Sequence, residues 1–333
     1  MNDTITAIST TLGLGAISII RVSGKEAIEK VNNITNINLK EKQTHTVSYG
    51  YIIENKNIID EVLITVMKAP KTFTTEDTVE INCHGGVATT KKVLEMILDQ
   101  GIRLAEPGEF TKRAFLNGRI DLTKSQAVND LINAKTEKAR QIVINNLTGT
   151  TTNKIKKLRE KLVQIISNIE VNIDYPEYQD IEEMTNQKIK QEINNIEKEL
   201  NQIIENSQNS KLITNGINIA IVGRPNVGKS SILNKLIEQD KAIVTNIPGT
   251  TRDIVEATFQ LEGIELNLID TAGIRETTDL VEQIGVKKSK QAIEKADLVL
   301  LVLNNNEKLT SEDKKLLEET KNKRRIIVLN KTD

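Results

Sequence analysis

The segment "INIAIVGRPNVGKSSILNKLIE" constrains the fold of this chain more than any other part of its sequence. An apolar run that reads as a β-strand leads into Gly223–Ser230, which matches the pattern G-x-x-x-x-G-K-[ST], and a helical stretch follows. In such a loop, backbone N–H groups wrap phosphate oxygens, the lysine reaches the β- and γ-phosphates, and the hydroxyl can ligate Mg²⁺. This order of elements predicts a doubly wound α/β nucleotide-binding domain.

Three further motifs indicate that the nucleotide is GTP. "DTAG", Asp270–Gly273, follows an apolar strand, where the aspartate belongs to the outer shell of Mg²⁺ and the glycine N–H meets the γ-phosphate. "PGTTRD", Pro248–Asp253, supplies a threonine that can complete the Mg²⁺ shell, although an ordinary surface turn is the alternative. "NKTD", Asn330–Asp333, offers a carboxylate for the N1–H and 2-amino donors of guanine, which adenine lacks.

These loops give the predicted site. The residues predicted to bind GTP are Asn226, Val227, Gly228, Lys229, Ser230, Ser231, Thr245, Asn246, Ile247, Pro248, Gly249, Thr250, Thr251, Asp270, Thr271, Ala272, Gly273, Asn330, Lys331, Thr332 and Asp333. Within this set, Lys229, Gly249 and Thr251 are predicted to take part in catalysis, and Ser230 and Thr251 to hold Mg²⁺.

The position after the "DTAG" glycine raises a question about catalysis. GTPases of the Ras and Gα type place a glutamine there to orient the attacking water. This chain has Ile274, which can neither accept a proton nor hold a water molecule. Either the protein does not hydrolyse its nucleotide, or another group does that work.

Composition excludes several other classes of protein. Lys and Arg number 45 against 46 Asp and Glu, which argues against a protein coated in basic charge for nucleic acid. Cys83 is the only cysteine of the chain, so an internal disulfide framework is impossible and a reducing compartment is expected. The segment "MNDTITAIST" lacks a signal-peptide pattern, and no apolar run approaches the roughly 18 residues of a membrane span. We therefore expect a cytoplasmic protein.

Residues 1–118 mix short apolar runs with turn signals. "GAISIIRVSG" reads as a strand, and "GYIIENKNIIDEVLITVMKAP" as two strands around a polar turn at Asn55–Asn57. "TVEINCHGG" reads as a strand that ends at paired glycines, with a helix over Val87–Leu98 after it. Cys83 and His84 lack the spacing of a zinc site, so a turn into the helix, with a supporting role near a ligand, is the better interpretation.

Residues 119–210 and 211–333 follow two different patterns. Two amphipathic helices of bundle type are predicted from the series Ile155, Leu158, Leu162, Ile165, Ile169 and the series Ile189, Ile193, Ile196, Leu200, Ile203. Asp174–Asp180 breaks the pattern between them, and the basic Lys154–Lys161 is read as a solvated helix face rather than an RNA site. From residue 211 onward, "INIAIVG", "IELNLID", "ADLVLLVL" and "RIIVLN" read as four apolar strands.

The GTP-binding loops together resemble those of translation-factor-related GTPases with a hydrophobic residue in place of the catalytic glutamine. Longer segments narrow the resemblance: "DTITAISTTLGLGAISIIRVSG", "FTTEDTVEINCHGG", "PGEFTKRAFLNGRIDLTKSQAVNDLI" and "GTTRDIVEATFQLEGIELNLIDTAGIR". In this order, over essentially the whole chain, they resemble the MnmE (TrmE) family of tRNA modification GTPases. The resemblance implies a multi-domain α/β protein with an N-terminal α+β folate-binding domain (1–118), a helical-bundle middle domain (119–210) and an incomplete P-loop GTPase domain (211–333).

The family resemblance also implies partners and cofactors. Members dimerise through the N-terminal domain and, with the flavoprotein MnmG (GidA) in a heterotetramer, modify C5 of the wobble uridine of certain tRNAs. The resemblance implies 5-formyl- or methylene-tetrahydrofolate as the carbon donor and FAD held by the partner. Folate contacts carry over to Arg21, Glu80 and Arg119, where the family pattern often has lysine at the third position. A strand-face carboxylate for Glu80 and a surface role for Arg119 are the alternatives.

The resemblance offers an answer to the missing glutamine. Members with this pattern use K⁺ near the γ-phosphate, which implies ligands at Asn226, Thr245, Ile247 and Thr250. Carbonyl cages suit K⁺ because they replace its hydration shell. Glu282 matches the family's candidate for orienting the water and is the fourth predicted catalytic residue; an exposed helix carboxylate is the alternative. An arginine finger within the chain, Arg252 or Arg275, is a rival explanation.

Other functions stay open from sequence alone. A ribosome-assembly GTPase that acts as a switch on RNA should carry an RNA-binding module such as a KH domain, and no G-x-x-G loop in that context is evident. A folate-dependent aminomethyltransferase with an accessory phosphate loop should turn over without GTP. The family pattern also continues past Asp333, through a second helical segment to a Cys-x-Gly-Lys tail. We expect a chain that ends at Asp333 to bind GTP weakly, if at all, and to be inactive on tRNA.

Overall fold

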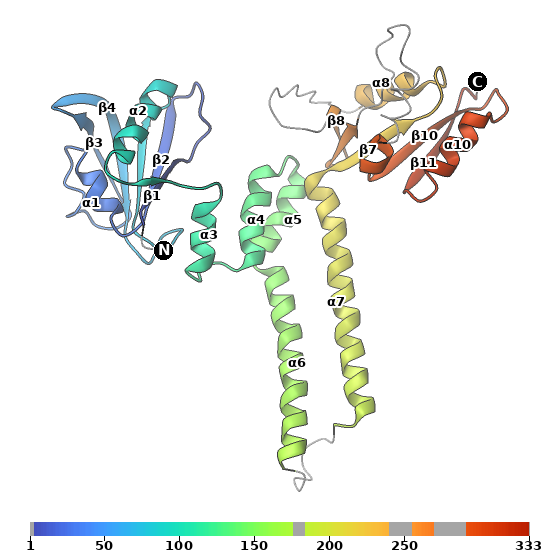
Figure 1. Ribbon diagram of the computed structural model, residues 1–333, viewed down its shortest axis with the longest axis horizontal. Coiled ribbons are helices and arrows are strands. Elements are labelled where there is room, and N and C mark those ends of the chain that lie inside the picture. Colours follow the sequence, from blue (N-terminus) through green and yellow to red (C-terminus); the bar gives the residue numbers. More distant parts are fainter. Residues whose placement is uncertain (1–2, 176–183, 240–254, 270–290, 333) are drawn as a thin grey trace. The chain divides into compact units, whose positions relative to one another are not determined.

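The computed structural model describes residues 3–175, 184–239, 255–269 and 291–332 (Figure 1). The residues fall into two compact units, Met1–Val128 and Asn129–Asp333, which are described separately below. The boundary falls inside helix α4, Leu122–Asn133. The division into domains at residues 118 and 210 stays a prediction. Within the described residues, no helix has the length and apolar character needed to cross a membrane.

The first unit is built on a six-stranded sheet with the order β3-β4-β5-β2-β1-β6. Its strands are β1 (Ile5–Ile8), β2 (Ile17–Ser23), β3 (Thr46–Glu54), β4 (Asn57–Met67), β5 (Thr78–His84) and β6 (Arg103–Leu104). Its helices are α1 (Ala27–Asn32), α2 (Val87–Leu98) and α3 (Glu109–Leu116). Neighbouring strands are antiparallel except β1 and β6, which run parallel.

The predicted elements of this unit are confirmed. The "GAISIIRVSG" strand is β2, and the two strands around the polar turn are β3 and β4. Asn55 and Lys56 make that turn with positive φ angles of 48° and 71°. The helix predicted over Val87–Leu98 is α2, with the same bounds, and it follows β5 through Gly85 and Gly86.

Only one face of this sheet meets α1 and α2. Ile20 and Val22 of β2 and Ile81 of β5 are fully buried in a core with residues of both helices. Because successive side chains of a strand point to opposite faces, Arg21 and Glu80 lie on the other face. Strand geometry therefore keeps these two residues, both predicted to bind folate, out of the core.

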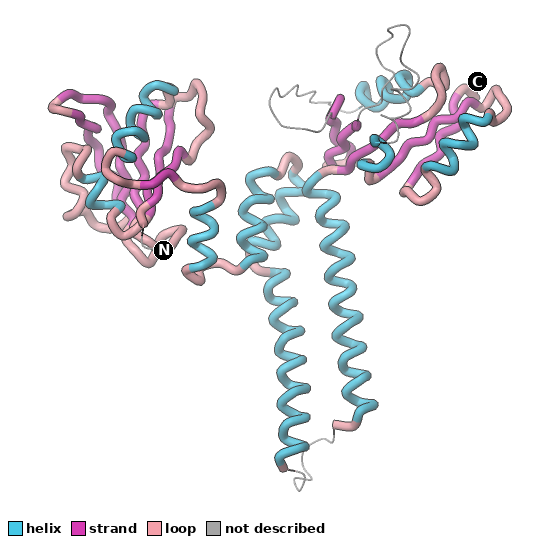
Figure 2. Tube along the Cα trace, viewed as in Figure 1, coloured by secondary structure: helices cyan, strands magenta, loops and turns pink. Residues whose placement is uncertain are grey.

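The second unit begins with helices and continues into a second sheet, as the colours of Figure 2 show. Its helices are α5 (Glu137–Leu147), α6 (Thr150–Asp174), α7 (Asn186–Asn215), α8 (Lys229–Gln239) and α10 (Ser311–Glu319). The long helices α6 and α7 pair side by side (Figure 1), and α5 packs against both. The two predicted bundle helices are thereby confirmed.

The apolar seams of these helices are only partly buried. Leu158, Ile165 and Ile196 are at most 9% exposed, whereas Leu162 and Leu200 are 42% and 45% exposed. Within the described residues, each apolar series is thus buried at some positions and exposed at others. The helices that pack against α6 and α7 within the described residues cover a narrower stripe than the apolar face of a bundle helix presents. The basic segment before Leu158 is exposed, as predicted.

The second sheet has five strands in the order β11-β10-β7-β9-β8. They are β7 (Ile217–Val222), β8 (Val255–Leu261), β9 (Ile264–Ile269), β10 (Leu298–Asn304) and β11 (Arg325–Asn330). One face packs against α8 and the other against α10 and the segment around Ala292, which is the predicted doubly wound arrangement. The four predicted strands, β11, β10, β7 and β9, are each parallel to their neighbours in this set. The fifth strand, β8, was not predicted from the sequence and is antiparallel to β9.

Candidate functional site

The phosphate loop lies where the strand order of the second sheet reverses. From β7 the chain proceeds to β9 on one side and to β10 on the other, and ligands of α/β sheets bind at such a point beyond the carboxyl ends of the strands. The loop joins the end of β7, at Val222, to the start of α8, at Lys229. The predicted strand, loop and helix are confirmed, and the positive end of the α8 dipole adjoins the loop.

The two glycines of the loop are required by close approaches. A side chain at Gly223 would lie 2.5 Å from the carbonyl oxygen of Val302. A side chain at Gly228 would collide with the Asn330 amide, and its φ of 95° also favours glycine. The Asn330 amide instead donates to the Val227 carbonyl over 2.8 Å. The first residue of the guanine-reading motif thus braces the phosphate loop.

Lys229 carries a positive charge that no carboxylate of the described residues compensates. Its Nζ donates to the carbonyl oxygens of Gly223 and Arg224, each over 2.7 Å. Burial lowers the pKa of this lysine, and within the described residues no charged group offsets that effect. An ammonium that only neutral carbonyls hold is suited to neutralise phosphate oxygens.

The remaining described residues of the loop present polar groups to solvent. Asn226, Ser230 and Ser231 are exposed. Asn226 has a left-handed backbone with φ of 61°, a conformation that asparagine tolerates better than most residues. Ser230, in the first turn of α8, fits the predicted Mg²⁺ ligand because its hydroxyl is accessible and hard cations prefer oxygen. Beyond Asn330, Lys331 and Thr332 are exposed too.

Arg224 anchors the loop to the first turn of α10 and to the segment between β10 and α10. Its Nε donates to Asp313 Oδ1 over 3.0 Å, and its Nη2 to Glu307 Oε2 over 2.8 Å. Asp313 is 3% exposed and also closes a capping box with Thr310 at the start of α10. Burial opposes ionisation, but hydrogen bonds from Thr310 and Arg224 hold the pKa of Asp313 below its usual value. The loop is therefore fixed by a charged contact as well as by Asn330.

A second group of predicted residues meets in the first unit. Arg21 and Glu80 are directly paired across β2 and β5, and Nε and Nη2 of the arginine contact Glu80 Oε1 over 2.8 and 2.6 Å. The guanidinium of Arg119 lies 5.1 Å from the ring centre of Phe73. Glu80 is thus ion-paired on the strand face and Arg119 is exposed, and the roles of all three residues in folate binding stay predictions.

The "CHGG" segment ends β5 and leads into α2, as the sequence predicted. Cys83 is buried, and burial raises the pKa of its thiol, so it lacks the character of a reactive thiolate. His84 Nδ1 lies 2.6 Å from Asp60 Oδ1, and this hydrogen bond raises the pKa of the imidazole. The supporting role of the "CHGG" segment near folate stays a prediction.

Comparison with known proteins covers both units. A family model described as GTP-binding protein TrmE N-terminus matches residues 4–119, and one described as 50S ribosome-binding GTPase matches residues 218–331. Over 99% of its length the chain is 54% identical to the tRNA modification GTPases MnmE of Streptococcus mutans and Streptococcus thermophilus, and 53% to that of Bacillus cytotoxicus. It covers 73% of each of these relatives.

The chain belongs to the MnmE family of tRNA modification GTPases. As a member of the MnmE family it is a GTP hydrolase, and its GTPase domain binds GTP with Mg²⁺. The match of residues 4–119 to a TrmE-specific model favours this family over a ribosome-assembly switch.

Solved structures resemble only parts of this MnmE-family chain. A variant of Era from Aquifex aeolicus bound to GDP and AlF₄⁻ is 34% identical to this chain in the matched region. The match covers 35% of this chain and 41% of the Era chain, with a TM-score of 0.27. The G domain of the Thermotoga maritima iron transporter FeoB is 29% identical in the matched region. That match covers 34% of this chain and 70% of the FeoB chain, with a TM-score of 0.23. The fold assignment therefore rests on the family models and the described elements.

Several predicted residues of the MnmE-family site lie outside the described residues. They are Thr245, Asn246, Ile247, Pro248, Gly249, Thr250, Thr251, Asp270, Thr271, Ala272, Gly273, Glu282 and Asp333, together with the rival arginines Arg252 and Arg275. Their roles stay predictions.

Sequence reasoning missed Arg224 and its partners. Thr310–Asp313, "TSED", is a capping-box pattern that marks the start of a helix. That pattern predicts that Asp313 lies in the first turn of a helix. No feature of the neighbouring sequence indicates that Arg224, 89 positions earlier, contacts it. The missed contact depends on β7 and β10 being neighbours in the sheet.

We expect Arg224→Gln to weaken GTP binding. The change removes the anchor of the loop and leaves Asp313 buried beside it, so affinity should fall by about fivefold to tenfold. Glu307→Gln is the matched control: Glu307 is 54% exposed, so we expect less than a roughly twofold change. Fluorescent GTP titration measures both, and equal effects of the two variants would show that the buried contact does not position the loop.

Proposed function

We propose that this protein is a K⁺-activated GTPase of wobble-uridine modification. It hydrolyses GTP to GDP and phosphate while C5 of the uridine in tRNA receives a carbon from 5-formyl- or methylene-tetrahydrofolate, which becomes the methylene bonded to C5 in a modification of the 5-carboxymethylaminomethyl type. The chain acts in the cytoplasm as a homodimer, within a heterotetramer with the flavoprotein MnmG. The tRNA substrate is supported by the relatives, which are tRNA modification GTPases, and the finer steps by the family resemblance.

One observation carries the folate part of this proposal. Arg21 and Glu80, which are 59 positions apart, meet on the face of the sheet that α1 and α2 leave uncovered. A carboxylate there suits the ring N–H and amino donors of a pterin, and arginine suits the carboxylates of the folate tail. Folate donates a one-carbon unit when bound; the chain's own contribution is to bind and orient it.

The GTPase part of the proposal rests on the phosphate loop. Lys229 and the N-terminus of α8 offset the charge of the phosphates, and Ser230 with Thr251 would hold Mg²⁺. Asn226, Thr245, Ile247 and Thr250 would hold K⁺, which supplies positive charge near the γ-phosphate. Glu282 would orient the attacking water, the function that Ile274 cannot perform.

Folate titration tests the proposal directly. We expect Arg21→Ala to weaken binding of 5-formyl-tetrahydrofolate at least about tenfold, because a charge-assisted contact is lost. GTP affinity should be unchanged, since the phosphate loop belongs to the second unit. Lys40→Ala, which removes another cation of the first unit, is the control. Undiminished folate affinity in Arg21→Ala would refute the assignment, as would absence of folate binding by the unmodified protein.

A further inference from the structure

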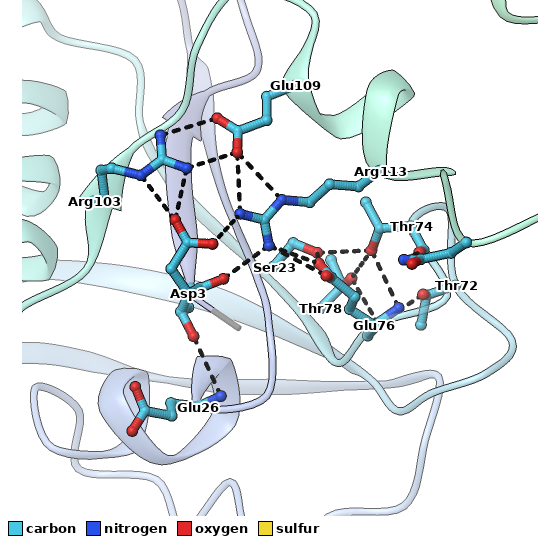
Figure 3. Close-up of polar contacts among 12 residues, drawn as sticks. Asp3, Ser23, Glu26, Thr72, Thr74, Glu76, Thr78, Arg103, Glu109 and Arg113 are labelled. Atoms are coloured by element: carbon cyan, nitrogen blue, oxygen red, sulfur yellow. Dashed lines mark hydrogen bonds and ion pairs between the residues drawn. The ribbon is translucent and has the colours of Figure 1, made fainter. Parts of the chain in front are cut away.

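Charged side chains of the first unit form a continuous network of hydrogen bonds and ion pairs (Figure 3). Arg113 and Glu109 of α3 are 1% and 2% exposed, and Arg113 Nη2 donates to Glu109 Oε1 over 3.0 Å. Arg103 of β6 donates to the same Glu109 oxygen over 2.7 Å, and Asp3 accepts from both arginines. The network ties α3 to β6 and to the segment before β1.

The same network holds the loop that precedes β5. Nη1 of Arg113 lies 3.2 Å from both carboxylate oxygens of Glu76, and Ser23 of β2 donates to that carboxylate over 2.9 Å. Ser23 also bonds the Thr74 hydroxyl over 2.7 Å (Figure 3). The Asn117 amide, just past α3, donates to the Thr74 carbonyl over 2.7 Å. The loop is thus fixed by β2 and by the segment that follows α3.

Two phenylalanines in the segments held by this network contact the arginines of the proposed folate site. Phe110, in the first turn of α3, has its ring centre 5.6 Å from the guanidinium carbon of Arg21. Phe73, in the loop before β5, has its ring centre 5.1 Å from that of Arg119. Both separations are within the range of cation–π contacts. Each arginine is therefore held beside an aromatic ring.

These arginine–aromatic pairs leave hydrogen-bonding capacity for a ligand. Arg21 uses Nε and Nη2 on Glu80, and within the described residues its Nη1 has no acceptor. Arg119 has no carboxylate partner among the described residues. A guanidinium whose face meets a ring still offers its N–H edge to a carboxylate. A ligand that combines flat rings with carboxylates matches both components of each pair.

We propose that Phe110 and Phe73 contact the folate, and that the network of Asp3, Arg103, Glu109, Arg113 and Glu76 positions them. The inference rests on the proposed function, because it assigns further residues to the same site. The phenyl rings give the flat rings of folate a surface to stack on, which adds to the contacts made by Arg21, Glu80 and Arg119. Phe110 and Phe73 are ligand-contacting residues, whereas the five network residues act through them.

Matched leucine variants test the contact. Phe110→Leu should lower the affinity for 5-formyl-tetrahydrofolate about threefold to tenfold in calorimetry, because an aromatic contact is lost. Phe110→Tyr, which keeps the ring, should retain the affinity. Phe115→Leu is the control, since Phe115 lies on the same helix and is 40% exposed. Equal affinities of Phe110→Leu and Phe115→Leu would overturn the inference.

A fluorescence experiment reports proximity independently of affinity. The chain has no tryptophan, so Phe110→Trp introduces a single emitter. We expect 5-formyl-tetrahydrofolate to change its emission in a saturable way, while GTP without folate leaves it unchanged. Phe115→Trp should respond to neither ligand. A change of equal size in both variants, or no change in Phe110→Trp, would contradict direct contact.

The positioning role is tested in the Phe110→Trp protein. Adding Glu76→Gln should raise the folate concentration at half-maximal response severalfold while GTP affinity stays the same. Asn117→Ala, at an exposed position, is a second variant that loosens the same loop and should act in the same direction. Unchanged midpoints in both variants would refute the positioning role. If the unmodified protein binds no folate, the proposed function itself fails; if it binds folate and Phe110→Leu binds it with undiminished affinity, only this inference fails.

Discussion

GTP hydrolysis by this protein is expected to be on the order of 100-fold faster in K⁺ than in Na⁺. The expectation follows from Ile274, which cannot orient water, and from the oxygen of Asn226 at the phosphate loop. A bound cation offsets charge that develops on the phosphates, and K⁺ matches cages of carbonyl oxygens better than Na⁺. The effect should stay below the roughly 10³- to 10⁵-fold of an arginine finger, because an ion donates no hydrogen bonds.

Two variants of Asn226 separate the effect of its side-chain oxygen from the effect of its backbone conformation. Since Asn226 has φ of 61°, alanine there introduces backbone strain of about 1 kcal/mol, whereas glycine does not. We expect Asn226→Gly and Asn226→Ala to hydrolyse GTP at the same slow rate in both salts. Asn55→Gly, which has φ of 48° in the β3–β4 turn, is the matched control and should keep the K⁺ effect. Equal rates of the unmodified protein in K⁺ and Na⁺ would exclude activation by potassium.

The arginine-finger alternative gives the opposite pattern. If Arg252 or Arg275 supplied the positive charge, replacing that arginine with alanine would slow GTP hydrolysis in both salts. The unmodified protein would then hydrolyse GTP at the same rate in K⁺ and in Na⁺. Rates of the two alanine variants in each salt therefore decide between an ion and a side chain.

Glu109→Gln is expected to lower the free energy of unfolding of the first unit by about 3 kcal/mol. Glu109 is 2% exposed and accepts hydrogen bonds from Arg103, from Arg113 and from the Glu106 amide. The neutral amide would leave Arg113 buried with less compensating charge. Hydrogen exchange of peptides from residues 103–117 measures the change. Glu29→Gln, which removes an exposed partner of Lys40, should have almost no effect.

The Glu109 carboxylate also makes the stability of the first unit depend on pH under acidic conditions. Its hydrogen bonds, that from Arg103 foremost, lower the pKa of Glu109 from 4.5 to about 2. A carboxyl with a depressed pKa in the folded state contributes stability that is complete above pH 4.5 and is lost as the pH falls toward 2. The difference of roughly 2.5 units corresponds to about 3 kcal/mol. Protection against exchange in residues 103–117, taken relative to the intrinsic exchange rate at each pH, should fall across that range, and in Glu109→Gln this fall should be weaker. Identical pH profiles would show that Glu109 is not the titrating group.

The GTP-binding loops could be predicted because their chemistry is local. Gly223–Ser230 carries its glycines, lysine and serine in one short stretch between a strand and a helix. The helix over Val87–Leu98 was predictable for the same reason, since its apolar period and the preceding glycines lie within the segment itself. Such patterns need no knowledge of distant residues.

Other features could not be predicted because they depend on which elements become neighbours. Which positions of the two apolar series are buried, such as Leu158, and which are exposed, such as Leu162, depends on how α5, α6 and α7 pack, and the period alone does not state it. The edge strand β8 was missed because polar and apolar residues alternate in its sequence, "VEATFQL", so it lacks the continuous apolar run by which the other four strands were recognised. Phe110 and Phe73 gave no signal, since an aromatic residue in a helix or loop reads as ordinary packing.

By itself the sequence determined the phosphate loop, its strand and helix, the alternation that keeps Arg21 and Glu80 off the core face, and membership of the MnmE family. Only the tertiary structure decided that Arg21 meets Glu80 across 59 positions, Arg224 meets Asp313 across 89, and Asn330 meets Val227 across 103. The physical reason is that strand order and register, which arise from the packing of whole elements, bring these side chains within hydrogen-bonding distance.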